Sequence, residues 1–586
     1  MTLSSKVLWS FLTLLLSLPL FGETTWYVRP DGGTRYSTNA RKGQCDGKAD
    51  AAYRGSGVNQ HCAFNDYRFL YDDQSYGNRA WVIAGGDTVI LRGGPWRVGF
   101  ATNNNNHVWC SGGQGPYSCT NPTIPAGTPA QHTRILGENH GNCSQSKMTQ
   151  LYGGFGVAST LNLSGAQYVD VECIELTRHS QCIEHGEPRL PSDCNRDFPG
   201  IDDYATEGIN TNTQTHDLLL QDMWIHRFPD RGIIGPIGGV VTANRVDIAY
   251  NGMSGWDFDD GSGSNKGNGT ANLPGSVWNF NNSIIEWSGC NEAYPGTGAI
   301  SCYGQSNGGY GDGVGTPPGT CLTANIDHST FRYNVQDGLD LGHIDTGKCS
   351  MKITNSNAYG NGGGTFKWGP NENPAILINN VVIANCARMS APIQGAAPAY
   401  NAHLGDFCRA GDAVSFNFRQ GGLAFFANNT FVTYAPASFD TQCWDAPGVG
   451  SGSINTGCGN STLVFKNNIV LGYDNPKTYD LDGKPGGPAF FYFRDNIGHI
   501  DRANNLYFGI RNLHCPTGHA NERCDNPKFV SQPRFSKEQD LDNFNVHLSD
   551  SSPARGTGAR IPEVQSDFSG KPRPPAGGYD IGASQY

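Results

Sequence analysis

The sequence predicts an all-β protein, a right-handed parallel β-helix in which short strands coil into a solenoid of stacked rungs. From about residue 167 onward, segments with alternating apolar and polar residues recur, rich in β-branched and aromatic side chains. Examples are VVTANRVDIAYNG, CLTANIDHSTFRYN and LVFKNNIVLGY. Their spacing of roughly 23–28 residues fits one turn of such a solenoid, and helical periodicity is nearly absent.

Each of these segments has Asn, Asp or Ser near its middle, where a coiled chain must bend. Asparagine tolerates the left-handed backbone conformation, and its side chain can stack on its copies in neighbouring rungs. A propeller would need longer units of four strands each, and a leucine-rich repeat would need helices and regularly spaced leucines. The pattern therefore favours the β-helix over both alternatives.

Four parts follow one another along the 586 residues. Residues 1–22 carry a lysine, an apolar stretch and a terminal glycine, which predicts a secretory signal peptide and a secreted protein. Residues 23–165 should form an N-terminal cap and the first rungs, and 166–480 the central β-helix with an active groove. Residues 481–586 should form the last rungs and a tail, and insertions rich in Gly, Pro and Cys should become loops beside the groove.

The 18 cysteines all follow residue 22, and an even number in an exported chain predicts disulfides. Cys321 and Cys349 stand at matching points of consecutive repeats, so a bond between them would join adjacent rungs. No CxxC pair or His/Cys cluster with zinc spacing is present in the sequence. The other expected pairs are near neighbours: Cys45/Cys62, Cys110/Cys119, Cys182/Cys194, Cys290/Cys302, Cys386/Cys408, Cys443/Cys458 and Cys515/Cys524.

The net charge of −11 argues against a nucleic-acid partner, because no basic patch is present to neutralise phosphates. An acidic protein can still bind an anionic polymer through a local cationic groove or a bound metal ion. The apolar stretch in residues 1–22 is shorter than the ~20 residues that a membrane span needs, and no later segment is long enough. Nothing in the sequence indicates obligate assembly, so a monomer is expected.

One motif, Asn-x5-Asp/Lys, occurs three times in the same register of the predicted strands. The segments are Asn251-GMSGW-Asp257, Asn334-VQDGL-Asp340 and Asn361-GGGTF-Lys367. The last two are separated by about one turn of a β-helix, whose stacked strands lie roughly 4.8 Å apart. The motif therefore predicts that Asp340 and Lys367 lie side by side on adjacent rungs of one face.

Further acids are expected to join this pair. Asp337 lies three residues before Asp340, and Asp312 about one rung before Asp337. With Gln336, these side chains should converge within roughly 5–8 Å. Carboxylates that are this close repel one another unless a cation binds, and oxygen-only ligands favour a hard cation, in the first place Ca2+.

Lys367 allows two interpretations. It can be a surface lysine paired with Asp340, which would contribute little to stability if exposed. Alternatively it is a general base whose pKa is lowered by a nearby positive charge such as bound Ca2+. A lysine base beside such an ion suits β-elimination on a uronic-acid polymer, in which the ion binds the uronate carboxylate and acidifies the C5 proton.

Two segments of the chain are QDGLD at 336–340 and, one rung later, GGTFKWG at 363–369. Together they resemble polysaccharide lyase family nine, the secreted pectate lyases with a β-helix fold. The resemblance implies Ca2+ ligands at Asp312, Asp337 and Asp340, a base at Lys367, and pectate or a related acidic polysaccharide as substrate. The chain departs from the family's DDG-x-D motif at its first acid, where Gln336 stands as a neutral ligand.

Four other residues are candidate contacts to substrate. Arg231 precedes the acid cluster by two or three rungs and Arg419 follows Lys367, so either could hold a uronate carboxylate bidentately. Trp256 and Trp368 follow the same rungs and could stack on sugar rings.

Two other functions remain open from the sequence. One is a glycoside hydrolase that uses an acid pair among Asp257, Asp259 and Asp260. The other is a non-catalytic β-helix that binds glycans or serves at a surface, which the glutamine at position 336 favours.

Overall fold

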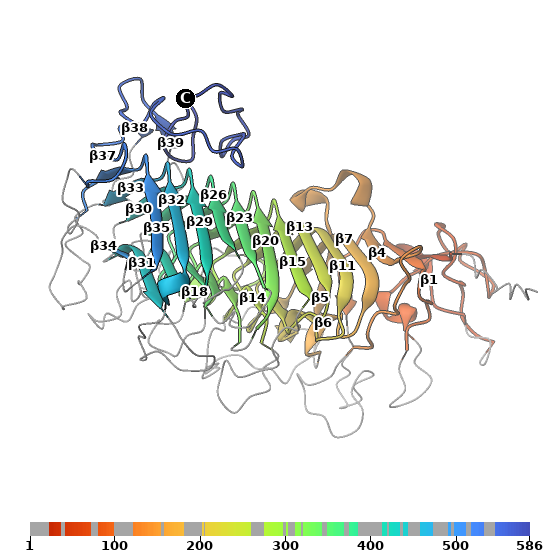
Figure 1. Cartoon of the computed structure of the whole chain (residues 1–586). Coiled ribbons are helices and arrows are strands. Elements are labelled where there is room, and N and C mark those ends of the chain that lie inside the picture. Colours follow the sequence, from red (N-terminus) through yellow and green to blue (C-terminus); the bar gives the residue numbers. More distant parts are fainter. Residues whose placement is uncertain are drawn as a thin grey trace, which may run out of the picture.

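The computed structural model confirms the parallel β-helix, which runs as one stacked row of strands in the order of the sequence (Figure 1). Among the described residues the helical elements are short 3₁₀ turns, and no helix there is long and apolar enough to cross a membrane. The structure describes residues 23–36, 41–71, 80–98, 121–153, 157–180, 202–203, 205–259, 275–296, 300–302, 311–317, 320–342, 349–368, 374–384, 413–418, 421–433, 437–443, 458–472, 490–493, 497–510, 517–531 and 545–586.

A typical rung consists of three strands, one on each face of the coil. In one rung these are β20 (Leu322–Asp327), β21 (Thr330–Arg332) and β22 (Leu339–Leu341), and each pairs in parallel with the corresponding strand of the next rung. That next rung has β23 (Met351–Thr354), β24 (Asn357–Tyr359) and β25 (Phe366–Trp368). The first face contains β20 and β23, the second face β21 and β24, and the third face β22 and β25.

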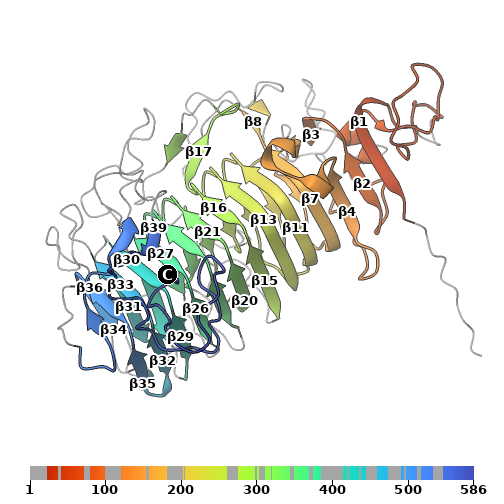
Figure 2. The ribbon, with the colours of Figure 1, turned by 90° about the horizontal axis from the view of Figure 1, so that it is seen from above.

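The first and second faces form one sheet of 23 strands that continues around a corner. Figure 2 shows its strands fanning out side by side along the coil. Its other strands are β1 (Thr25–Gly33), β2 (Thr88–Leu91), β3 (Trp96–Val98), β4 (Thr133–Gly137), β5 (Thr149–Gly153), β7 (Gln167–Thr177), β11 (His216–His226), β13 (Val240–Ala249), β15 (Ser276–Asn281), β16 (Ile284–Glu286), β26 (Ala375–Ile378), β27 (Val381–Ala384), β29 (Leu423–Ala427), β30 (Thr430–Thr433), β32 (Thr462–Lys466), β33 (Ile469–Gly472), β35 (His499–Ala503), β36 (Leu506–Phe508) and β37 (Arg523–Cys524).

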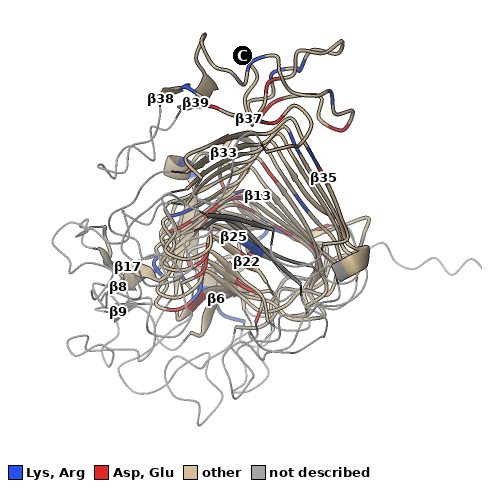
Figure 3. Cartoon of the chain, turned by 60° about the vertical axis from the view of Figure 1, so that its left-hand side comes forward, with Lys and Arg blue, Asp and Glu red and all other residues tan. Residues whose placement is uncertain are grey.

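The third face is a separate sheet of ten strands that stack in sequence order. Figure 3 looks obliquely along the coil and shows the strands around a common interior. Besides β22 and β25, the third face contains β6 (Ser159–Asn162), β10 (Glu207–Asn210), β12 (Ile233–Ile234), β14 (Trp256–Asp257), β19 (Val314–Gly315), β28 (Val414–Phe418), β31 (Ala437–Cys443) and β34 (Phe490–Phe493).

The remaining described elements lie outside the two large sheets. Three antiparallel pairs are β8 (His179–Ser180) with β9 (Asp202–Asp203), β17 (Cys290–Glu292) with β18 (Ile300–Cys302), and β38 (Phe529–Ser531) with β39 (Asn545–Leu548). The 3₁₀ turns are η1 (Tyr67–Leu70), η2 (His140–Asn142), η3 (Gln145–Lys147) and η5 (Cys458–Asn460).

Alternating residues of each strand point into the coil and form one continuous apolar core. In the third face, successive inward positions are filled by Trp256, Val314, Leu339, Phe366 and Val414, which are all fully buried. Residues between these positions point outward, which is the alternation that strand geometry imposes. The same alternation therefore decides which side chains of the third face can meet a ligand.

The corner between the first and second faces is built by paired asparagines. The first residue of each pair has a left-handed backbone, with φ of 57° at Asn379 and 55° at Asn428. The second residue is buried and bonds to the next rung, since Asn380 Nδ2 donates to Asn429 Oδ1 over 3.0 Å and Asn429 Nδ2 to Asn468 Oδ1 over 3.0 Å. The predicted stacking of asparagines at a bend is confirmed here.

The C-terminal segment packs on the outside of this corner, where it lies above the last rungs in Figure 1. The first asparagine of each pair holds it: Asn379 Nδ2 donates to the Ser566 carbonyl over 2.8 Å, and Asn428 Nδ2 to the Asp580 carbonyl over 3.0 Å. Arg573, itself buried, completes the contact by donating to Asn379 Oδ1 over 3.1 Å.

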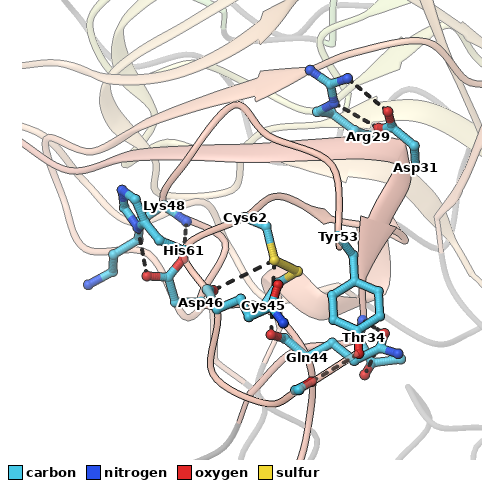
Figure 4. The surroundings of a disulfide bond; sticks show 12 residues. Arg29, Asp31, Thr34, Gln44, Cys45, Asp46, Lys48, Tyr53, His61 and Cys62 are labelled. Carbon is cyan, nitrogen blue, oxygen red and sulfur yellow. Dashed lines mark hydrogen bonds and ion pairs between the residues drawn. A yellow bond between two sulfur atoms is a disulfide. The ribbon is translucent and has the colours of Figure 1, made fainter. Parts of the chain in front are cut away.

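Three of the expected disulfides are confirmed: Cys45–Cys62, Cys290–Cys302 and Cys321–Cys349. A fourth bond, Cys143–Cys173, joins two cysteines that the sequence left without a partner. Figure 4 shows the first of these bonds among the hydrogen-bonded loops of the N-terminal region. The side chains of Cys443 and Cys458 are not described, and the other expected pairs and the predicted signal peptide at residues 1–22 include residues outside the described part of the chain.

Candidate functional site

The candidate site is a row of outward residues on the third face, one from each rung. Strand register aligns Asp257 with Gly315, places Gly315 beside Asp340, and pairs Asp340 with Lys367. Asp340 and Lys367 are therefore neighbours across adjacent strands, and Asp257 lies two rungs from Asp340. We call these four positions the acid–lysine row; Figure 3 labels β22 and β25, which carry its last two residues.

Asparagines that begin the three motifs hold the corner that leads into this face. Asn334 Nδ2 donates to Asn361 Oδ1 over 2.9 Å, and Asn361 Nδ2 donates to the Phe331 carbonyl over 3.0 Å. Asn251 Oδ1 accepts the Phe228 N–H over 3.1 Å. The three side chains are buried, so the recurring asparagine of the motif is structural and sets the register of the residue six positions later.

Lys367 lies between two carboxylates of the preceding rung. Its Nζ is 2.6 Å from Asp340 Oδ2 and 3.2 Å from Asp337 Oδ2. The second oxygen of each acid accepts a backbone N–H, from Gly364 to Asp337 over 2.6 Å and from Gly342 to Asp340 over 2.7 Å. Both acids are buried, whereas the Lys367 side chain is 33% exposed. The Lys367 side chain is therefore the most exposed of these three.

Asp312 joins this cluster from the rung before. Its Oδ1 accepts the Asp337 N–H over 2.9 Å. Gln336 is buried next to Asp337, and its carbonyl accepts the Gly363 N–H over 2.8 Å. The structure thus brings the four predicted Ca2+ ligands and Lys367 together on three adjacent rungs.

The charges of the cluster do not balance, because three carboxylates surround one ammonium group. Burial raises the pKa of Asp312 well above its ordinary value, and Asp337 and Asp340 raise it further. Burial also raises the pKa of Asp337, although Lys367 opposes the shift. For Lys367 burial would lower the pKa, but Asp340 and Asp337 outweigh it and raise the pKa above the ordinary value. The lysine is therefore an ammonium ion in this arrangement.

The donor chemistry of the cluster fits a hard cation such as Ca2+, since it offers carboxylate oxygens and excess negative charge. Among the residues that the structure describes, no group of three or more His, Cys, Asp or Glu side chains is positioned as a set of metal ligands. In the described arrangement Lys367 instead occupies Oδ2 of both Asp337 and Asp340. The residue types therefore fit the ion, and its coordination geometry is not formed.

Arg231 lies at the other end of the row and is bound within the protein. Its Nε is 2.7 Å from Asp257 Oδ2, and its Nη1 is 2.8 Å from Asp230 Oδ1. Only 12% of its side chain is exposed. Burial would lower its pKa, but Asp230 and Asp257 raise it, so the guanidinium stays charged. A role in holding substrate remains a prediction, and the partner Asp230 was not foreseen from the sequence.

The predicted sugar contact at Trp256 is wrong. Its side chain is fully buried and packs against Phe258 and Trp278, with ring centroids 5.4 Å apart in both pairs. The reason is that side chains alternate along a strand: Asp257 points outward, so Trp256 directly before it points inward. The side chain of Trp368 and the whole of Arg419 lie outside the described residues.

The acids of the hydrolase alternative are partly described. Asp257 Oδ1 accepts the Asp259 N–H over 3.0 Å, and burial raises the pKa of Asp257 against the effect of Arg231. Asp260 lies outside the described residues. Gly315 was missed by the sequence interpretation, which looked for charged residues; the spacing that places Asp312 one rung before Asp337 also aligns Gly315 with Asp340.

No protein-family model and no curated protein matches the chain. Among solved structures it is similar to pectate lyase Pel9A, with 13% identity and a TM-score of 0.42 over 96% of both chains. It is also similar to the PL6 family alginate lyase AlyGC (13%, 0.34, 80% of this chain and 55% of that one) and to a rhamnogalacturonan lyase (12%, 0.32, 90% and 95%). A likeness at this level does not extend to activity, so the function has to rest on the residues of this chain.

Proposed function

We propose that this chain is a secreted, Ca2+-dependent polysaccharide lyase that cleaves pectate or a related uronic-acid polymer by β-elimination. The observation that carries the proposal is the position of Lys367, whose side chain is partly exposed and whose Nζ lies 2.6 Å from Asp340 Oδ2, beside the buried Asp337 and the half-buried Asp312. Disulfides among the described residues fit an oxidising, extracytoplasmic location.

In the proposed reaction the uncharged Lys367 amine removes the C5 proton of a uronate unit. The electron pair of that C–H bond forms the C4–C5 double bond, the bond from C4 to the glycosidic oxygen breaks, and that oxygen takes a proton from solvent. Asp312, Asp337 and Asp340, with Gln336, would hold Ca2+. When bound, the ion would supply positive charge that binds the substrate carboxylate, stabilises charge at C5 and offsets the acids that raise the Lys367 pKa.

The test is ultraviolet absorbance of the unsaturated product on polygalacturonate, alginate and related polymers, with Ca2+ and with a chelator. Lys367→Ala is compared with wild type, and Lys352→Ala is the control because that lysine is exposed on the first face. We expect product formation that needs Ca2+, is lost in Lys367→Ala and is kept in Lys352→Ala. Absence of unsaturated product on every uronate polymer would overturn the proposal.

A second candidate is a glycan-binding β-helix without catalysis. The ion pairs of Lys367 with Asp337 and Asp340 favour it, because they satisfy the lysine without a ligand. Binding of the same polymers without unsaturated product would support this candidate, and release of reducing sugar without the double bond would support hydrolysis by Asp257 and its neighbours.

A further inference from the structure

Gly315 is the one residue without a side chain in the acid–lysine row. Its strand β19 keeps regular parallel register with β14 on one side and β22 on the other. Asp257 and Asp340 flank it, and these two residues lie on strands that are two rungs, or roughly 9–10 Å, apart. The missing side chain therefore leaves a gap between two acidic positions, which we call the Gly315 gap.

Neighbouring glycines have a packing reason that Gly315 lacks. A Cβ atom on Gly313 would lie 2.3 Å from the Gly338 carbonyl oxygen, and one on Gly338 would lie 2.6 Å from the Thr365 carbonyl oxygen. A Cβ atom on Gly315 would meet only Asp257 Oδ1 at 3.7 Å and Asp312 Oδ2 at 3.8 Å, which is ordinary contact. Gly315 also has no positive φ. Neither backbone conformation nor packing requires glycine at this position.

Glycine within a strand lowers stability relative to alanine, because it loses more conformational freedom on folding. Where it occurs, it often marks a bulge, a sharp bend, or a place where another backbone or a ligand approaches closely. Regular register excludes a bulge at Gly315, and the chain does not bend at residues 314–317, where the Gly315 carbonyl accepts the Phe258 N–H over 3.0 Å. No backbone atom approaches its Cβ position within 4 Å. A ligand is the explanation that remains.

We propose that the Gly315 gap seats a sugar unit of the acidic polymer next to the unit that reacts at Lys367. This inference rests on the proposed function and names a binding position for the same substrate. Asp257 Oδ1 and Asp312 Oδ2 border the gap and are hydrogen-bond acceptors. As acceptors they fit the hydroxyl groups of the sugar ring.

Graded filling of the gap tests this inference. Gly315→Ala adds one methyl group that the structure accommodates, whereas Gly315→Val and Gly315→Leu add side chains that project into the gap. We expect kcat/KM to fall by less than about threefold for alanine and by about tenfold or more for valine and leucine, mainly through KM. Thermal stability should stay level or rise, because valine favours strands.

The matched control is Gly141→Val, because a Cβ atom at Gly141 meets no atom within 4 Å and this residue lies in η2, outside the third face. It should leave kcat/KM unchanged. If wild type cleaves the polymer and Gly315→Leu cleaves it equally well, the inference is wrong and the lyase proposal stands. If wild type shows no elimination, the lyase proposal fails, and affinity electrophoresis in the same polymers then tests whether the Gly315 gap binds sugar. Equal retardation of wild type and Gly315→Leu, or no retardation of either, would overturn the inference about the gap.

Discussion

The asparagine corner and the acid–lysine row are both columns with one residue per rung, yet they differ in what their residues do for one another. At the corner the same amide repeats, and each buried side chain, such as Asn429, bonds to the next copy. In the row the residue changes at every rung, from Asp257 through Gly315 and Asp340 to Lys367. The repeated asparagines satisfy one another's hydrogen bonds and build the coil. The acid–lysine row, where the residue differs from rung to rung, instead brings together charged side chains whose charges do not cancel.

The difference has an energetic cause. A neutral amide that donates and accepts is fully paired when its copies stack, so the column can continue without limit. Stacked carboxylates repel each other, and burial penalises each charge, as the raised pKa of Asp312 shows. A β-helix can therefore contain such acids only where other charges, or a ligand, compensate them.

The largest effect is expected for Lys367→Arg. Arginine keeps the positive charge beside Asp337 and Asp340, but it does not deprotonate and cannot act as a base. The elimination rate should fall by about 10²–10⁴-fold, while the midpoint of chemical unfolding stays close to that of wild type. Rate and unfolding are measured on the same preparation. A variant that retains full activity would show that Lys367 acts through its charge alone.

Asn429→Ala should do the reverse of Lys367→Arg, lowering stability and leaving activity unchanged. It removes the acceptor of both the Asn380 N–H and the Asn380 Nδ2 group, and the donor to the Leu377 carbonyl. Buried groups without partners cost about 1–3 kcal/mol each, so the free energy of unfolding should fall by roughly 2–4 kcal/mol. Urea denaturation measures this loss. Activity per folded molecule should be unchanged, and a selective loss of activity would contradict the division between the two columns.

A smaller loss is expected for Asn428→Ala, the outer residue of the same pair. It removes donors to the carbonyls of Asp580 and Gly582 and places alanine at a φ of 55°. We expect about 1–2 kcal/mol of destabilisation. Asn428→Gly is the matched variant, because it tolerates this backbone and isolates the lost contact with the C-terminal segment. Limited proteolysis should cut that segment faster in both variants, and equal rates to wild type would be inconsistent with the docking role.

A further prediction concerns pH and the second face. Burial, and then the charge of Glu286, raise the pKa of Asp247 to about 8. The folded state therefore binds a proton more tightly than the unfolded state. Stability from this group is complete below the unfolded pKa, near 3.8, and is lost as pH rises through about 8. Asp247→Asn should flatten the fall in unfolding midpoint between pH 5 and pH 8, and an unchanged slope would show that another group titrates.

Local patterns were enough for the coil and for part of the site. Strand alternation and the asparagines at the bend predict the rungs, because each of these patterns can be recognised within a few consecutive residues. Asp340 and Lys367 were correctly aligned since they lie in consecutive rungs, as β22 and β25. Cys321 and Cys349 were paired for the same reason.

Tertiary structure alone decided the rest. The row passes through Gly315 between Asp257 and Asp340, and only the paired strands show that Asp257 aligns with Gly315 across the long insertion. Arg231 forms ion pairs with its chain neighbour Asp230 and with Asp257, and the second pair depends on side chains that meet across rungs. A repeat determines the position of a residue along the coil, because the repeat is visible within a short stretch of sequence. The set of charged side chains that meet, and the place where a side chain is missing between them, depend on contacts that only the folded chain brings together.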